Sequence, residues 1–376
     1  MSWTLLLFLL SISYGVSKLV RGLHKARHQA RFAEDHNCAS PAKLQPGQII
    51  GLSTTLDYYR SVKDGTAFQK TLQRFITIGT TFEGKRFGTT TIQTIDPVNI
   101  ECVLKTNAND YLVGPSKAAL FEGFIGKSAF SVDGEEWKHH RSILRPAFSK
   151  KNLSSFTAYE SHVQRLLGLL PSDGKPVDLQ ALFSKLTFDV SNTYLFGGCG
   201  PLLLEEDQDD SKAEFAKAVD RCNSAGLTKY MLGWVDRFRP QRSYWRDTEL
   251  VHRFADRYID LALAEQTSKP GLDDVGVAEK GERTSSFLQS LAQTTNSRQE
   301  LRDAAMTLLV GGRDTTASFL SHLFLCLSRH PRVWKKLRDE VKALDGAEPD
   351  PQNVRQLTYL RQCMDEGTYA FSGKHG

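Results

Sequence analysis

The sequence lacks the cysteine spacing that would build a metal site or a disulfide framework. Its six cysteines lie far apart, form no C-x-x-C pair and have no histidine at metal-ligand spacing. The pattern argues against structural zinc and against a disulfide scaffold, and it predicts reduced thiols in a chain that faces the cytosol. These cysteines are Cys38, Cys102, Cys199, Cys222, Cys326 and Cys363.

A strong excess of either charge is also missing. The 376 residues carry 48 basic and 43 acidic side chains, a formal net charge of +5. This excess is too small and too scattered to predict a nucleic-acid partner, although a weakly basic face for an acidic protein stays open. The chain has no internal repeat and no extended low-complexity segment. Its composition, 40% hydrophobic and 24% charged, is that of an ordinary globular protein.

The N-terminus is apolar from Trp3 to Val16 and is followed by a cluster of lysine and arginine that begins at Lys18. A helix extended to Val20 would be about 28 Å long, close to the roughly 30 Å hydrocarbon core of a bilayer. A cleaved signal peptide is the alternative, but no basic segment precedes the apolar run. We expect residues 1–20 to form a single-pass membrane anchor, with the basic cluster on the cytosolic side. Residues 21–47, basic and ending in proline and glycine, are expected to be a linker.

Helical spacing of apolar residues dominates the rest of the chain. Residues 82–94 are instead rich in threonine, phenylalanine and isoleucine with glycine breaks, which predicts a hairpin or small sheet. The predicted fold class is mainly α with a small β-sheet, in one domain over residues 48–366. The acidic run 205–210 and residues 268–283 are expected to be exposed loops.

A long central helix is predicted between a capping box at Ser297 and Glu300 and a stop before Pro331. It would be about 45 Å long and apolar on nearly every face. Its centre reads Gly311-Gly312-Arg313-Asp314-Thr315-Thr316, where each glycine costs about 1 kcal/mol against alanine and a buried aspartate costs more unless it is paired. The spacing fits a kink with threonines bonded to their own helix. It fits equally a notch for a large planar ligand beside an acid and an alcohol that relay protons.

A second segment places Trp137 and Arg141 four residues apart, on one face of a predicted helix. The planar fork of an arginine suits a carboxylate, because it can bind both oxygens. A surface arginine stacked on a tryptophan is the plainer interpretation. The neighbouring His139 and His140 point about 100° apart on a helix, so we do not expect them to bind a metal.

Together these segments resemble the cytochrome P450 family, in the order the family has them. The central motif is similar to the signature of the helix that crosses the distal face of the haem, and Trp137 with Arg141 is similar to the pair that contacts a haem propionate. The resemblance, strongest to the fungal microsomal n-alkane and fatty-acid hydroxylases, implies the cytochrome P450 fold and a haem. It implies catalytic roles for Asp314 and Thr315, and haem contacts for Trp137, Arg141, Gly311 and Gly312. It also implies a long apolar substrate (alkane, fatty acid or secondary metabolite), electrons from NADPH through cytochrome P450 reductase, and the endoplasmic reticulum membrane.

The resemblance stops after Glu366. Tyr369 stands where the family's E-x-x-R motif has arginine, and the loop F-x-x-G-x-R-x-C-x-G, whose cysteine binds the haem iron, is absent. Phe196 to Gly200 has the wrong spacing to replace it. We expect a C-terminally truncated domain, an aberrant tail over residues 367–376, and little or no monooxygenase activity in this chain. Two alternatives stay open: a complete, active enzyme misrepresented by its gene model, and a membrane-anchored helical protein that binds without catalysis.

Overall fold

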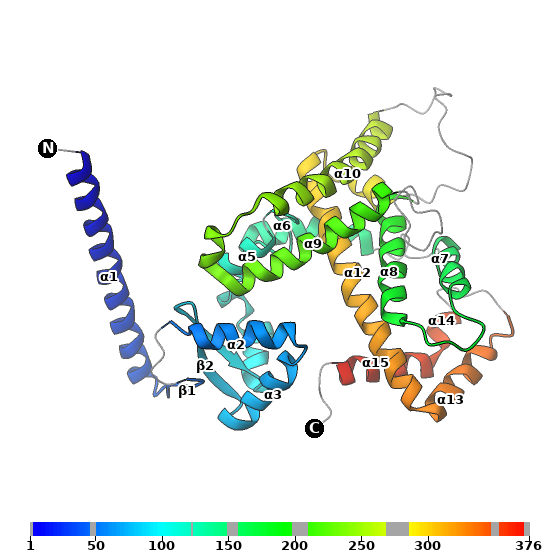
Figure 1. Cartoon of the computed structure of the whole chain (residues 1–376), viewed down its shortest axis with the longest axis horizontal. Helices are drawn as coiled ribbons and strands as arrows, with labels where there is room; N and C mark the ends of the chain where they lie inside the picture. Colours follow the sequence, from blue (N-terminus) through cyan, green and yellow to red (C-terminus); the bar gives the residue numbers. More distant parts are fainter. Residues whose placement is uncertain are drawn as a thin grey trace. The chain divides into compact units, whose positions relative to one another are not determined.

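The computed structural model describes residues 3–45, 50–121, 123–148, 157–197, 210–267, 286–346 and 353–371. The chain divides into two compact units, Met1–Asp110 and Tyr111–Gly376 (Figure 1). In these residues helices dominate and a single sheet has three strands, so the predicted fold class is confirmed. Residues 205–209 of the predicted acidic loop, the predicted loop 268–283, and Cys199 lie outside the described residues.

The first unit contains a small sheet with strand order β1-β2-β3. Strands β2 and β3 pair antiparallel, from Thr81 opposite Thr94 to Arg86 opposite Thr89, which confirms the predicted hairpin. Phe87 and Gly88 form its turn with positive φ angles of 44° and 79°, as a two-residue hairpin turn requires. The elements are α1 (Trp3–Asp35), β1 (Ala42–Lys43), α2 (Leu52–Lys63), α3 (Ala67–Ile78), β2 (Thr81–Arg86), β3 (Thr89–Thr94), α4 (Pro97–Glu101), η1 (Cys102–Thr106) and η2 (Ala108–Asp110).

Helix α1 runs through the predicted anchor and through much of the predicted linker. In the part of the chain that the structure describes, no helix has a stretch long and apolar enough to cross a membrane. The predicted single-pass anchor is therefore not supported. Ser11, Ser13 and Ser17 interrupt the apolar start of α1, and Lys18 follows them. The last part of the predicted linker contributes β1, which pairs in parallel with β2.

The described residues of the second unit form helices and connecting loops, and none of them forms a strand. Its elements are α5 (Pro115–Phe121), α6 (Gly134–Leu144), η3 (Arg145–Phe148), α7 (Thr157–Gly168), α8 (Leu179–Phe196), α9 (Asp210–Leu232), η4 (Gly233–Phe238), α10 (Arg242–Thr267), α11 (Phe287–Ala292), α12 (Arg298–Arg329), α13 (Pro331–Lys342), α14 (Asn353–Gln356) and α15 (Thr358–Phe371).

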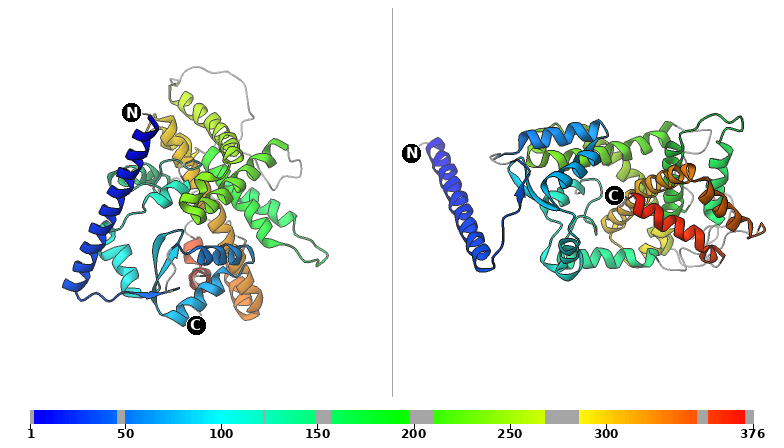
Figure 2. Two further views of the ribbon diagram at one scale, coloured as in Figure 1. Left: turned by 60° about the vertical axis from the view of Figure 1, so that its left-hand side comes forward. Right: turned by 90° about the horizontal axis from the view of Figure 1, so that it is seen from below.

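Helix α12 is the element around which this unit packs. Helix α8 lies along it, α10 packs on α9 and on α12, and α13 and α15 contact its C-terminal part (Figures 1 and 2). The core gathers on the α8, α9 and α10 side, where Phe188, Phe215, Leu301, Met306 and Leu309 are almost fully buried. A long helix that is apolar on most faces needs such cover, because leaving its apolar surface in water costs free energy.

Both ends of α12 lie where the sequence predicts them. The hydroxyl of Ser297 accepts the backbone N–H of Glu300 at 3.4 Å, and Pro331 opens the next helix directly after α12. The Glu300 carboxylate does not complete the capping box, because it accepts from the Thr295 hydroxyl and contacts the His139 ring. It thereby joins the start of α12 to α6.

Helix α15 runs into the predicted tail. Residues 367–371 continue this helix to Phe371. The Thr368 hydroxyl donates to the Met364 carbonyl one turn earlier. Gly367 faces α12, where an added Cβ would lie 3.1 Å from a Leu323 methyl group. The close approach of two helices at Gly367 thus stabilises a segment whose sequence alone shows little helical pattern.

Candidate functional site: a cavity between α6 and α12

A cavity of about 790 Å³ lies between α6 and the N-terminal half of α12. This volume is within the range of sites that hold cofactors or drug-sized ligands. Its wall combines aromatic, aliphatic and cationic side chains, among them Phe130, Trp137, Arg141, Arg145, Thr307 and Leu308. Such a wall can hold an apolar body at one end and a carboxylate at the other.

Helix α6 supplies the cationic edge of the cavity. Trp137 and Arg141 share one face of the helix, and the guanidinium carbon of Arg141 lies 5.3 Å from the centre of the tryptophan ring. Glu135 and Glu136 occupy the first turn, where acidic side chains favour the helix dipole. Each has a lysine partner, so neither neutralises Arg141. Arg141 can therefore bind an anion with both arms of its fork.

The two signature glycines have different neighbours. An added Cβ at Gly311 would lie 3.7 Å from the Phe130 ring, so this glycine faces the wall of the cavity. An added Cβ at Gly312 would instead lie 3.2 Å from the Ser191 hydroxyl on α8. Gly311 thus belongs to the predicted ligand notch, whereas Gly312 serves the packing of α8 on α12.

At the centre of the motif the aspartate, Asp314, is exposed, and the neighbouring arginine, Arg313, is buried. Asp314 has a side chain that is 56% exposed, and it accepts from the side-chain amide of Asn223 on α9 at 3.2 Å. The buried charge is Arg313, whose side chain is 7% exposed. Sequence reasoning assigned this arginine no role. Its burial follows from its position, since Arg313 is on the same side of α12 as buried Leu309 and Ala317, four residues away in each direction.

Thr315 makes the hydrogen bond to its own helix that the kink interpretation of the motif predicts. Its hydroxyl donates to the Gly311 carbonyl at 2.6 Å, one turn earlier, and the residue is exposed. Thr307 makes the same type of bond to the Asp303 carbonyl. A hydroxyl that donates to its own helix still keeps oxygen lone pairs that can accept a proton from a partner. The back-bonded threonine is therefore compatible with a proton-relay role and does not require it.

The remaining candidates for metal binding are engaged elsewhere. His139 contacts Glu300 at 2.8 Å and His140 at 5.4 Å between ring centres. Burial and the neighbouring His139 lower the pKa of His140, which favours its neutral form. Among the described residues, no group of three or more histidine, cysteine or acidic side chains is placed to hold a metal ion.

The described cysteines do not offer a thiolate to this cavity. None of Cys38, Cys102, Cys222, Cys326 and Cys363 is among its lining residues. Burial raises the pKa of Cys222 to about 11, and burial also raises that of Cys363, so both thiols stay protonated at neutral pH. The residues around the cavity fit the carboxylate edge and the apolar face of a haem, and they do not include its axial ligand.

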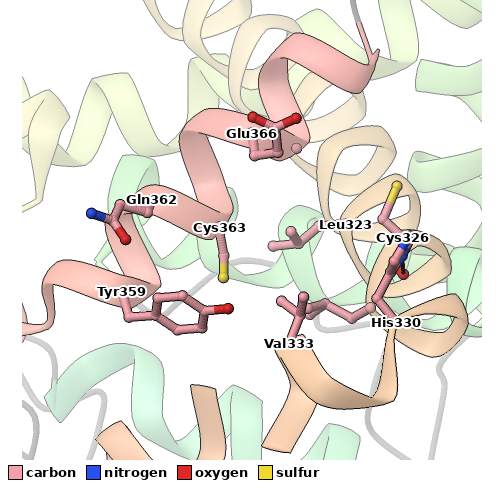
Figure 3. Close-up of a pocket in the computed structure, with 10 residues that line it drawn as sticks. Leu323, Cys326, His330, Val333, Tyr359, Gln362, Cys363 and Glu366 are labelled. Atoms are coloured by element: carbon pink, nitrogen blue, oxygen red, sulfur yellow. Dashed lines mark hydrogen bonds between the residues drawn. The ribbon is translucent and has the colours of Figure 1, made fainter. Parts of the chain in front are cut away.

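A second cavity, of about 470 Å³, lies where α12, α13 and α15 meet. Tyr359 and Cys363 point from α15 toward Leu323 and Val333, with Glu366 one turn further along α15 (Figure 3). This is the Glu366 that the sequence assigns to an E-x-x-R pair. The side chain of Tyr369 lies outside the described residues.

Sequence reasoning missed how α15 is held in place. The Glu340 carboxylate on α13 accepts the backbone N–H groups of Tyr359 and Leu360, each at 2.8 Å. These amides are in the first turn of α15, where N–H groups have no partner within the helix. The ammonium of Lys336 also lies 4.2 Å from the centre of the Tyr359 ring. No motif marks Glu340, because its partners are backbone atoms about twenty residues away.

Comparison with known proteins agrees with this architecture. The family model described as Cytochrome P450 matches residues 50–367. The chain is 32% identical over 351 residues to the cytochrome P450 monooxygenase fsdH of Fusarium heterosporum, covering 92% of this chain and 61% of that protein. It is 34% identical over 354 residues to himC of Aspergillus japonicus, covering 92% and 62%. It is 33% identical over 307 residues to cytochrome P450 52A4 of Candida maltosa, covering 74% and 53%.

The chain belongs to the cytochrome P450 family, and its similar relatives are fungal proteins. The family match contains α6, α12 and most of α15, and therefore all six predicted site residues. The chain spans less than two thirds of the length of the three relatives described above.

Proposed function

We propose that the protein of the full-length transcript is a haem-thiolate monooxygenase that hydroxylates a long apolar substrate, with electrons from NADPH delivered by cytochrome P450 reductase, and that this 376-residue chain alone has little or no such activity. The observation that carries the proposal is the cavity between α6 and α12, which is lined by Trp137 and Arg141 and by Phe130, the neighbour of Gly311. Membership of the family supports the haem and the redox partner.

In this proposal Arg141 and Trp137 hold a haem propionate. The guanidinium supplies two parallel donors to the carboxylate, and the tryptophan ring keeps the guanidinium in place from one side. Phe130, which lies beside Gly311, and Leu308 would supply the apolar surface against the haem. The haem supplies the oxygen-activating chemistry when it is bound, and an axial thiolate favours cleavage of the O–O bond.

Asp314 and Thr315 are proposed to move protons. Asp314 is exposed to water, and its contact with Asn223 fixes one carboxylate oxygen. The Thr315 hydroxyl is oriented by the Gly311 carbonyl, which leaves the oxygen lone pairs to accept and pass on a proton. Adjacent side chains on a helix point about 100° apart, so a relay between Asp314 and Thr315 would pass through water.

A long apolar substrate is supported by the wall of the cavity. Phe130, Leu308 and Phe148 contribute apolar surface, and threonine and arginine side chains are placed around them. Burial of a hydrocarbon chain contributes roughly 0.8 kcal/mol for each CH₂ group, so an alkane or fatty-acid chain would gain affinity with length. A secondary metabolite with a large apolar part would be recognised in the same way.

Helix α1 is proposed to attach the protein to a membrane surface. Its start is apolar up to Val16, and the rest of the helix carries Lys18, Arg21 and Lys25, a combination that favours binding to anionic lipid. Flotation with vesicles of phosphatidylcholine and phosphatidylserine tests this. The full chain should float with the vesicles, and a variant without residues 1–35 should stay at the bottom; equal behaviour would remove this part of the proposal.

The main experiment is a carbon monoxide difference spectrum of the protein translated from the full-length transcript, followed by NADPH-dependent turnover of dodecanoic acid with a reductase. A thiolate-type Soret band and a hydroxylated product are the expected results. A folded protein that binds no haem, or binds it without the thiolate-type band, would contradict the proposal. The 376-residue chain measured alone is expected to lack that band, because none of its described cysteines lines the cavity.

A further inference from the structure

A carboxylate on α12 reaches out of its helix to hold a loop. Asp303 lies two turns before Gly311 and is 3% exposed. Its Oδ2 accepts the backbone N–H of Lys127 at 3.0 Å. Burying an ionisable group costs free energy, so a buried aspartate is retained where its bonds do something that an apolar residue cannot. Here the bond fixes the loop over residues 126–131, which precedes α6.

The backbone of the loop is shaped to accept this carboxylate. Gly126 has φ +74°, and an added Cβ would lie 2.2 Å from the Oδ1 of Asp303. Only glycine combines this conformation with room for the carboxylate. The contact is thus specified from both sides, by an acid on α12 and by a glycine in the loop.

Side-chain hydrogen bonds then close the loop on itself. The Ser131 hydroxyl donates to the Gly126 carbonyl at 2.9 Å and accepts the Ser128 N–H at 2.8 Å. The Ser128 hydroxyl accepts the Phe130 N–H at 3.2 Å. These bonds transmit the position of Gly126 to Phe130, which is the loop residue beside Gly311 on the cavity wall.

The chain just before the loop is equally fixed. Phe124 and Ile125 are 3% and 1% exposed, within the main core. The Phe124 carbonyl contacts the His252 ring nitrogen of α10 at 2.8 Å. The loop therefore begins directly after residues that are buried in the core. Asp303 attaches the loop to α12, the helix that carries the motif Gly311 to Thr316.

We propose that Asp303 is a positioning residue that holds the loop 126–131 so that Phe130 packs beside Gly311 and shapes the cavity for an apolar ligand. The inference rests on the proposed function for the class of ligand, a long hydrocarbon chain. Its structural part stands without haem and without turnover. Asp303 itself is not among the residues that line the cavity.

The test places 4-fluorophenylalanine at position 130 of the full chain and records its single ¹⁹F resonance. The wild-type resonance is expected to differ from that of the free amino acid, because the ring is packed. Asp303→Ala should move it at least halfway toward the free value. Asp303→Asn, whose side-chain oxygen can still accept from Lys127, should leave it near the wild-type position. Unchanged resonance in Asp303→Ala, or equal displacement by alanine and asparagine, would overturn the proposal.

Two further variants separate positioning from general loss of stability. Leu291→Ala removes a core side chain on α11 that is 1% exposed, and it should lower the melting temperature without moving the resonance. Ser131→Ala should displace the resonance as Asp303→Ala does, which keeps the test informative if the Asp303 variant does not fold. A resonance that follows the melting temperature in all variants would contradict a positioning role.

The ligand part is tested by titrating the labelled chain with dodecan-1-ol, without haem. The alcohol should shift the wild-type resonance and should bind at least fivefold more weakly to Asp303→Ala. Equal affinity would show that the position of Phe130 does not shape the site. Because no haem or reductase is present, these results are independent of whether the protein proves to be a monooxygenase.

Discussion

The guanidinium of Arg313 on α12 lies 2.6 Å from the carboxylate of Asp220 on α9, and the two side chains differ sharply in exposure, 7% against 57%. The arginine also lies 5.0 Å from the centre of the Phe188 ring. An exposed acid thus neutralises a buried base at the middle of the signature. The stability of this part of α12 should depend on a residue that looks dispensable from its exposure.

Asp220→Ala is expected to lower the free energy of unfolding by about 2 to 3 kcal/mol, because it leaves a buried guanidinium without its nearest partner. The distant contact with Asp314, at 3.7 Å, should offset only part of this loss. Asp260→Ala is the matched control: Asp260 is also 57% exposed, but its partner Arg298 is 52% exposed. The control should cost less than about 1 kcal/mol. Equal effects in urea unfolding would contradict the burial argument.

Gly126→Ala should destabilise the protein far more than Gly174→Ala. Both glycines have nearly the same φ, +74° and +76°, so the backbone strain of an added Cβ, about 1 kcal/mol, is shared. At Gly174 nothing lies within 4 Å of the added Cβ, whereas at Gly126 it would collide with the Asp303 carboxylate. Thermal unfolding of the two variants measures the difference. Similar melting temperatures would show that the carboxylate moves away without loss.

Asp303 should make stability fall as the pH rises from about 4 to about 6. Burial raises its pKa from 3.8 to about 6, while the neighbouring Arg302 and Lys127 lower it and Glu300 raises it. In this window the folded protein holds a proton that the unfolded chain has lost, so unfolding releases a proton and becomes easier with increasing pH. The stability of wild type relative to Asp303→Asn should therefore decrease by up to about 3 kcal/mol across the window. Urea unfolding at four pH values checks this, and a constant difference would contradict it.

Arg141→Ala should weaken haem binding by about tenfold or more, because a charge-assisted hydrogen bond contributes about 1.5 to 3 kcal/mol. Arg141→Lys should be intermediate, since lysine keeps the charge and loses the planar fork. Lys335→Ala on α13 is the control, because Lys335 pairs only with Asp339 one turn later among the described contacts. Absorbance titration of haem measures the affinities. An alanine variant at position 141 with wild-type affinity would exclude this arginine from the site.

The long central helix, its two ends and the hairpin are predictable from the sequence because local rules determine them. A serine cap, a proline stop and a glycine-containing turn act over four residues or fewer. The burial of the Arg313 side chain and the exposure of the Asp314 side chain cannot be predicted in this way. Which of two adjacent charges is buried depends on what α8 and α9 place beside α12, and those helices are about 90 to 125 residues away in the chain.

The candidate site shows the same division. Trp137 and Arg141 could be identified from their spacing on one helix, and the structure places both on the cavity wall. Asp303 could not, because its partner is a backbone amide 176 residues away and no motif records a backbone amide. The continuation of α15 beyond Glu366 is hard to predict for a similar reason. Gly367 lowers the helix propensity of the segment, and the close approach of α12 that favours a glycine there is not visible in the sequence.

The contact of Gly312 with Ser191 of α8 gives this glycine a packing role of its own. An added Cβ would lie 3.2 Å from the serine hydroxyl, so a small residue is favoured where α8 packs on α12, whether or not a ligand is present. Selection for folding alone would keep a small side chain at this position after selection for catalysis had ended. The two glycines are therefore held by different neighbours: Gly312 by the packing of α8 on α12, and Gly311 by the Phe130 ring of the loop 126–131.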